Sequence, residues 1–214
     1  MKVYFISGLA ADSRVFKHIQ LPVHCEAVFV DWITPEKNES LRRYSLRLAT
    51  KINTREPFAI IGLSMGGMIT AEIIKLHKPV VAVLISSIPS SKQLPVYFKI
   101  AGRLKLYKIV PVSFAKSMSV MKRLFTTETR DDKTTLKQII RESDPAFIRW
   151  AMGAILNWKS ETPPETYVHI HGSKDEVLPL RFTNPTHVIQ KAGHLMVMNR
   201  AKEINAILQE VLPV

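Results

Sequence analysis

The chain has 214 residues, 46% of them hydrophobic and 22% charged, which is enough for one packed core and short for two. This composition excludes a disordered chain, and no apolar run approaches the roughly 18 to 20 residues that a membrane-spanning helix requires. The net charge of +12 belongs to the surface, and the single cysteine, Cys25, can form neither an internal disulfide nor a zinc cluster. We therefore expect one soluble domain in a reducing, cytoplasmic compartment.

The amino terminus allows two interpretations. Lys2 and the apolar or small residues 3–11 resemble the start of a secretory signal. Only about nine such residues are present, which is short for the core of a signal. We favour a buried strand that turns at Gly8.

Short apolar runs rich in β-branched residues recur along the chain, with helical segments between them. Such runs predict strands that are buried on both faces, which is typical of a parallel sheet. The alternation of strand and helix predicts an α/β fold with about six strands. The predicted strands are residues 3–7, 27–30, 58–61, 80–85, 167–171 and 186–189, and the predicted helices are residues 40–53, 65–77 and 201–212.

Residues 88–158 break this alternation, because they contain helix-like segments and no convincing strand. We expect a helical cap inserted into a core that is made of residues 1–87 and 159–214. Residues 73–127 hold ten Lys or Arg and no Asp or Glu, so much of the excess positive charge lies there.

Three roles fit this basic insertion. It can be a solvated face of cap helices without further function. Residues 96–110 interleave apolar side chains with cations, which also fits an interfacial helix at a membrane surface or a pocket lid for anionic or lipid-like substrates. Nucleic-acid binding has the least support, because no recognised module accompanies the charge.

The most informative stretch is FAIIGLSMGG at residues 58–67. A buried strand there runs into a G-x-S-x-G motif and then into a helix, the pattern of a nucleophile elbow. The two glycines leave room for a strained turn that lifts the Ser64 hydroxyl above the carboxyl ends of the strands. The N–H of Met65 lies at a helix amino terminus, where it favours developing negative charge. A chain with this content of Gly and Ser contains the motif by chance only about 0.02 times.

A serine hydroxyl is a weak nucleophile, so it needs a base, and the base needs an orienting acid. Asp175 ends the sequence HGSKD, which follows the penultimate predicted strand, and His194 follows the last one. In a parallel sheet both loops emerge at the same edge as the elbow. The chain order Ser64, Asp175, His194 is the one known for G-x-S-x-G enzymes.

With these motifs the chain resembles the α/β-hydrolase family over essentially its whole length. The resemblance implies a mostly parallel sheet flanked by helices, with a helical cap. It also implies Ser64 as the nucleophile, His194 as the general base and then acid, and Asp175 as the orienting carboxylate.

The resemblance further implies an oxyanion hole made of two backbone N–H groups. Residues 7–9, Ser-Gly-Leu, stand where the family has its oxyanion loop, after the first strand present. The N–H of Leu9 would therefore join that of Met65. A serine replaces the histidine of many members, which matters little if the donors are backbone groups.

The activity that the resemblance implies is hydrolysis of an ester or related acyl bond, such as a thioester, through an acyl-enzyme. No metal or organic cofactor is expected, and no specific nucleic acid is expected as a partner. The expected substrate is a small acyl compound, anionic or lipid-like in one interpretation. Two alternatives share the fold: a lyase or other non-hydrolytic enzyme on the same triad, and a catalytically silent ligand-binding protein.

The chain departs from the family pattern in three ways. The first two strands of the family are missing, which affects the sheet edge rather than the site. Only eighteen residues separate Asp175 from His194, so the usual crossover helix is reduced to a loop around residues 179–185. Glu176 is an alternative acid, although neighbouring side chains in an extended segment point apart. We favour Asp175 because of its position in the motif.

Other polar residues near the site have structural explanations as well. His169 and His171 share a face of their strand, but no third metal ligand is evident, so we expect them to brace the sheet and the acid loop. Asp12 and Arg14 could contact substrate or cap the first helix, and both interpretations stay open. Cys25 is expected to be a small packing residue.

Overall fold

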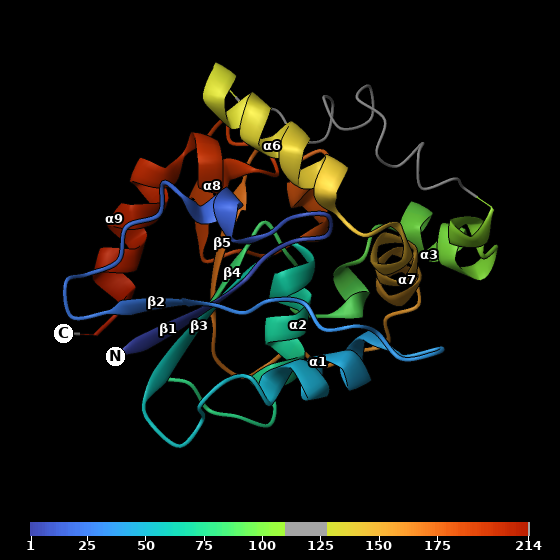
Figure 1. The fold of residues 1–214 in the computed structure, drawn as a ribbon, viewed down its shortest axis with the longest axis horizontal. Coiled ribbons are helices and arrows are strands. Elements are labelled where there is room, and N and C mark those ends of the chain that lie inside the picture. The colour runs from blue at the N-terminus through green and yellow to red at the C-terminus, as the bar shows by residue number, and fades with distance from the viewer. Residues whose placement is uncertain (110–127, 214) are drawn as a thin grey trace.

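The computed structural model of the protein describes residues 1–109 and 128–213. It contains a six-stranded sheet in the order β2-β1-β3-β4-β5-β6, in which every neighbouring pair is parallel (Figure 1). This confirms the predicted α/β architecture. The strands are β1 (Lys2–Ile6), β2 (Glu26–Phe29), β3 (Phe58–Leu63), β4 (Val81–Ile85), β5 (Val168–Gly172) and β6 (His187–Ile189).

The sheet register brings distant loops to one edge. Ile6 at the end of β1 pairs with Gly62, and Leu63 at the end of β3 pairs with Ile85. Since all six strands run in the same direction, the loops that follow β1, β3, β4, β5 and β6 leave the sheet on the same side.

The prediction that every strand is buried on both faces is wrong for the two edge strands. Phe29 of β2 is 44% exposed and Val188 of β6 is 39% exposed. Each edge strand has a neighbouring strand on one side only, so fewer side chains surround it. The four central strands are buried as predicted.

Two helices are shorter than their sequence pattern predicts. The first begins after Ser40, whose Oγ accepts a hydrogen bond from the N–H of Arg43, and it ends at Ala49. The N–H groups of residues 50–52 then bond carbonyls three residues back, which tightens the chain into a turn. The helices are α1 (Leu41–Ala49), α2 (Met65–Ile73), α3 (Val96–Arg103), α6 (Arg130–Glu142), α7 (Pro145–Leu156), α8 (Met196–Asn199) and α9 (Ala201–Val211). None of these described helices has the length and apolar character needed to span a membrane.

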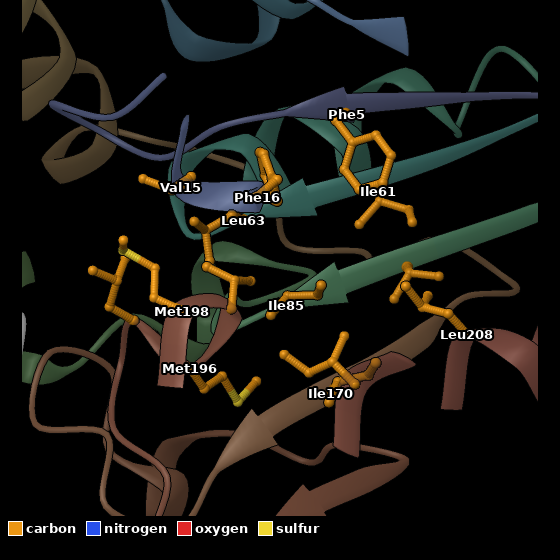
Figure 2. Close-up of a cluster of buried hydrophobic side chains, with 14 of the residues drawn as sticks. Phe5, Val15, Phe16, Ile61, Leu63, Ile85, Ile170, Met196, Met198 and Leu208 are labelled. Carbon is orange, nitrogen blue, oxygen red and sulfur yellow. The ribbon is translucent and has the colours of Figure 1, made fainter. Parts of the chain in front are cut away.

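Each face of the sheet carries one hydrophobic cluster, because alternate strand residues point to opposite sides. The first cluster packs side chains such as Phe5 and Ile61 against the 3-10 helix η1 (Ser13–Phe16) and against α6, α8 and α9 (Figure 2). The second packs Tyr4 and Ile60 against α1, α2 and α7. The sheet is therefore the middle layer of three (Figure 1).

The chain between β4 and β5 contributes α3, α6 and α7, and its described parts, residues 86–109 and 128–167, contain no strand. This agrees with the predicted helical insertion, while the division into core and cap stays a prediction. α3 packs against α7, and α7 also contacts α1. Three of the predicted basic residues lie outside the described residues: Lys116, Lys122 and Arg123.

α6 is joined to η1 by ion pairs. The Arg14 guanidinium lies 2.6 Å from a carboxylate oxygen of Glu142, and Lys17 Nζ lies 2.8 Å from Asp132 Oδ1. Burial alone would raise the pKa of Asp132, but hydrogen bonds from Lys17, Thr129 and His18 lower it to about 2. The insertion is thus tied to the core beside the loop that follows β1.

We expect Tyr44→Phe to lower the free energy of unfolding by about 1 to 3 kcal/mol. The Tyr44 side chain is fully buried, and its hydroxyl donates to the Ile33 carbonyl and accepts from the Ile33 N–H, both at 3.0 Å. Tyr4→Phe is the matched variant, because it removes one such bond, from the N–H of Asn53. Urea unfolding of both variants should show the larger loss for Tyr44→Phe, and an equal or smaller loss would contradict this account.

Candidate active site

Ser64 occupies a sharp turn between β3 and α2. Its φ is +52° and its ψ is −117°, a strained conformation for a residue with a side chain. The turn is held from both sides: the Ser64 N–H donates to the Ile85 carbonyl at 2.9 Å, and the Ser64 carbonyl accepts from Ser87 Oγ at 2.6 Å. The Ser64 hydroxyl makes no cap hydrogen bond to α2, so it is available to another partner.

The two glycines of the motif are required by close backbone approach. A Cβ at Gly62 would overlap the carbonyl of Gly66, and a Cβ at Gly66 would overlap the carbonyls of Ile6 and Ser7. Because these neighbours are backbone atoms, they could not move aside cheaply. The glycines of the G-x-S-x-G motif are therefore needed because a side chain would not fit at either position, as predicted for a nucleophile elbow.

His194 and Asp175 meet Ser64 at this edge of the sheet. His194 Nε2 lies 2.9 Å from Ser64 Oγ, and His194 Nδ1 lies 2.7 Å from Asp175 Oδ2. Both side chains are almost completely buried. The three predicted residues, which are up to 130 positions apart in the chain, thus form one continuous line of hydrogen-bonding groups.

Asp175 is held as a charged acceptor. Its Oδ1 accepts hydrogen bonds from the N–H groups of Val177 at 2.9 Å and Leu178 at 2.8 Å. Burial alone would raise the pKa of this carboxyl, but the charge and hydrogen bond of His194 and the Leu178 N–H hold it below its usual range. Asp175 therefore stays ionised at neutral pH.

Glu176, the neighbour of Asp175, also carries a carboxylate. Glu176 is exposed, whereas Asp175 is buried against His194. The expectation of an extended segment is wrong here, because the chain bends at residues 176–178 and the N–H groups of Val177 and Leu178 turn back to Asp175 Oδ1. The geometry thus favours Asp175 over Glu176 as the partner of the imidazole.

The loop after β1 runs beside the elbow. A Cβ at Gly8 would lie 3.3 Å from Ser64 Cβ, so the loop touches the serine. The loop is closed by the N–H of Ala11, which donates to the Gly8 carbonyl at 3.1 Å. Within the described residues, no acceptor takes the N–H of Leu9 or that of Met65, the first residue of α2. The predicted oxyanion hole needs two such unpaired N–H groups, and its assignment to Leu9 and Met65 stays a prediction.

Two further side chains support the site although no motif predicts them. Ser87 binds the carbonyl of Ser64, and Trp32 Nε1 donates to the Ala11 carbonyl at 3.1 Å. Each residue follows a strand at the edge of the sheet where Ser64 lies. That position is the only feature of the sequence that places these two residues near the site. Trp32 also lines a pocket of about 340 Å³, which lies between the loop after β1 and the junction of α6 and α7.

The two buried histidines of β5 have the structural roles that were predicted. His171 contacts the loop that carries Asp175, and His169 contacts His171 within the sheet. His171 Nε2 lies 2.8 Å from the Leu178 carbonyl, and His171 Nδ1 lies 3.2 Å from His169 Nε2. Burial lowers the pKa of both imidazoles, that of His169 to about 3. The described residues contain no group of three or more side chains that could hold a metal ion.

Asp12 and Arg14 form the predicted helix cap, and both also line the pocket of about 340 Å³. The Asp12 carboxylate caps η1 by accepting from the N–H of Arg14 at 3.0 Å, and it also pairs with the Arg14 guanidinium. The hydrogen bonds that the Arg14 guanidinium donates to the carboxylates of Asp12 and Glu142 raise its pKa. Cys25 is partly buried and packs against the first hydrophobic cluster, as expected.

Comparisons with known proteins identify the family and the fold of the chain. A model of the alpha/beta hydrolase family matches residues 3–207. A comparison with curated protein sequences gives no match. Among solved structures, a hydrolase from Pseudomonas aeruginosa superimposes with a TM-score of 0.73 at 14% identity, with 100% of this chain and 90% of that chain covered.

Two further structures have the same fold. A lipase-esterase related protein from Clostridium acetobutylicum has a TM-score of 0.71 at 12% identity and covers 99% of this chain and 94% of its own. An enol-lactonase from Burkholderia xenovorans has a TM-score of 0.70 at 14% identity, with 99% and 90% covered. At such low identity these likenesses establish the fold alone.

We expect the protein to lose stability as the pH falls from about 6.5 toward 3, partly through His169. The His169 imidazole is buried and neutral in the folded protein. As the pH falls, this side chain therefore binds a proton in the unfolded chain at a higher pH than in the folded protein. The free energy of unfolding should therefore fall by about 1.4 kcal/mol per pH unit for this group. Urea unfolding of wild type and His169→Phe between pH 5 and 7.5 measures the slope. A slope that is unchanged in the variant would exclude His169 as a cause.

Proposed function

We propose that this chain, which belongs to the alpha/beta hydrolase family, is a serine hydrolase that cleaves an ester or thioester bond through an acyl-enzyme. The observation that carries the proposal is the continuous hydrogen-bonded line from Ser64 through His194 to Asp175, with 2.9 and 2.7 Å between the joined atoms. A nucleophile, a base and an orienting acid in this geometry are the minimum set for serine catalysis.

The first half-reaction begins with proton transfer. In the neutral His194 ring, Nδ1–H donates to Asp175, so Nε2 is the acceptor for the Ser64 hydroxyl proton. As His194 takes this proton, Ser64 Oγ attacks the carbonyl carbon of the substrate. The N–H groups of Leu9 and Met65 donate to the resulting oxyanion. The imidazolium then protonates the leaving alcohol or thiol, and the acyl-enzyme remains.

The second half-reaction repeats these steps with water. His194 removes a proton from a water molecule, whose oxygen attacks the acyl carbon. The second tetrahedral intermediate collapses as His194 returns the proton to Ser64 Oγ, and the carboxylic acid leaves. The ionised Asp175 stabilises the imidazolium in both halves and keeps the ring in the productive tautomer.

A pocket of about 340 Å³ lies beside the loop that carries the Leu9 N–H, and Ser64, His194 and Asp175 do not line it. Its lining combines apolar side chains, Trp32, Ile139 and Phe147, with charged ones, Asp12, Arg14 and Glu142. This pocket suits a substrate with both an apolar and a polar part. The structures of an enol-lactonase and of a lipase-esterase related protein have the same fold, so lactones and carboxylic esters are the first compounds to test. No step of the proposed reaction requires a cofactor.

The experiment that tests this proposal combines labelling with turnover. A fluorophosphonate probe should modify Ser64, as located by mass spectrometry of the labelled peptide, and Ser64→Ala should prevent the labelling. A panel of p-nitrophenyl esters and thioesters that vary in acyl length and charge should then reveal turnover. If folded protein neither reacts with the probe nor hydrolyses any ester, the serine hydrolase proposal is wrong. Labelling with acyl trapping but without turnover would instead indicate a ligand-binding protein.

We expect Ser64→Ala and His194→Ala each to lower kcat by about 10⁴-fold or more, because the two side chains act as one unit. The double variant should be little worse than either single one for the same reason. Steady-state kinetics on the best ester measures both effects, and circular dichroism checks that the variants fold. Additive losses in the double variant would contradict a shared mechanism.

We expect Asp175→Asn to lower kcat strongly, though less than Ser64→Ala, because the amide favours the wrong tautomer of His194. Glu176→Gln is the matched control, since it makes the same chemical change at the adjacent, exposed carboxylate. It should leave kcat nearly unchanged. A larger loss for Glu176→Gln than for Asp175→Asn would transfer the acid role to Glu176.

A further inference from the structure

The outer face of α3 is apolar although it faces solvent. Val96 is 60% exposed, Ile100 is 50% exposed and Leu104, the C-cap residue, is 65% exposed. Tyr97, beside them, is 44% exposed. The spacing of these four residues places them on one side of the helix.

The opposite face of α3 is already used for packing. Phe98 packs against the second hydrophobic cluster. A Cβ at Gly102 would overlap the carbonyl of Leu156, so α3 approaches α7 closely. The exposure of these apolar residues is therefore not caused by loose attachment of α3. It has one apolar face for the fold and a second that the described residues leave uncovered.

Positive charge lies on α3 and in the residues that follow its carboxyl end. Arg103, Lys105 and Lys108 are exposed, and Lys99 Nζ bonds the carbonyl of Lys92. In the part of the chain that the structure describes, none of these cations pairs with a carboxylate. The sequence from residue 73 to 127 supplies no Asp or Glu that could neutralise them.

α3 also adjoins the loop that carries Asp175. Tyr97 Oη lies 3.5 Å from the carbonyl of Val177, whose N–H binds Asp175. The Tyr97 ring also contacts Phe182, over which the Arg181 guanidinium lies. The apolar and cationic face is thus located at the rim of the candidate active site, and α9 lies at the opposite end of the molecule (Figure 1).

We infer that the outer face of α3 binds the surface of a membrane that contains anionic lipids. Apolar side chains flanked by cations match such a surface, because the side chains enter the acyl boundary while Lys and Arg meet the phosphates. A nucleic acid would satisfy the charge but would give Val96, Ile100 and Leu104 no apolar environment. This binding is independent of the proposed hydrolysis, although it would place the site beside lipid-borne esters.

Vesicle binding tests the inference directly. Wild-type protein should sediment with phosphatidylcholine vesicles that contain one part in four of phosphatidylglycerol, and much less with pure phosphatidylcholine. Higher salt should weaken this binding, because the lipid charges become screened. Absence of binding to the anionic vesicles at low salt would overturn the inference.

Two sets of variants separate charge from apolar contact. The triple variant Arg103→Gln, Lys105→Gln, Lys108→Gln should bind anionic vesicles about 100-fold more weakly, at about fivefold per charge. Its control removes three exposed lysines elsewhere at the same net charge and should bind nearly as wild type. These controls are Lys51→Gln, Lys137→Gln and Lys202→Gln.

The apolar variant Ile100→Ser with Leu104→Ser should weaken vesicle binding at least tenfold. Its control, Leu76→Ser with Val23→Ser, changes two exposed apolar residues outside α3 and should bind as wild type. If only charge matters, and a DNA duplex binds as tightly as the vesicles do, the face is a general polyanion surface and the lipid inference is wrong.

The activity measurement keeps this inference separate from the proposed function. The triple charge variant and the double apolar variant should both hydrolyse a water-soluble ester at the wild-type rate. None of the changed residues belongs to the hydrogen-bonded line from Ser64 to Asp175. Vesicle binding by a wild-type protein without esterase activity would refute the proposed function alone. Esterase activity without vesicle binding would refute the lipid inference alone.

Discussion

The close contact between the end of β1 and the first turn of α2 is the constraint on which the site depends. Gly66 lies directly against the carbonyls of Ile6 and Ser7, and this proximity fixes the loop after β1 relative to the elbow. Ser64 and the two N–H donors of the candidate oxyanion hole therefore share one junction. Their relative positions follow from the pairing of β1 with β3 and need no support from the insertion.

A second junction fixes the positions of His194 and Asp175. The loops after β5 and β6 are joined by hydrogen bonds, from the Lys174 N–H to the Ala192 carbonyl at 2.8 Å and from the Lys191 N–H to Ser173 Oγ at 2.8 Å. Asp175 and His194 extend from these two loops. The site thus consists of two preassembled halves, and the central strands of the sheet set the distance between them.

Most of the fold and the central residues of the site could be predicted, because their signals are local. Buried strands have continuous apolar runs, and the elbow at Ser64 needs glycines at fixed positions. The exposure of Phe29 could not be predicted, since it depends on which strand forms the edge. The positions of Trp32 and Ser87 after predicted strands placed both residues near the site, but their hydrogen-bond partners could not be predicted, because those contacts join segments through tertiary packing. The absence of a crossover helix before His194 followed from chain length alone.

The two sides of the insertion differ in one of the forces that attach them to their neighbours. α6 is attached to η1 by ion pairs such as that of Arg14 with Glu142, in addition to its place in the first hydrophobic cluster, whereas at Gly102 α3 packs closely on the backbone of Leu156 in α7. Dissolved ions weaken the first kind of attachment and strengthen or spare the second. High salt would therefore weaken the ion-paired part of the α6 attachment, next to the loop after β1, and would leave the apolar part of that attachment and the contact between α3 and α7 in place.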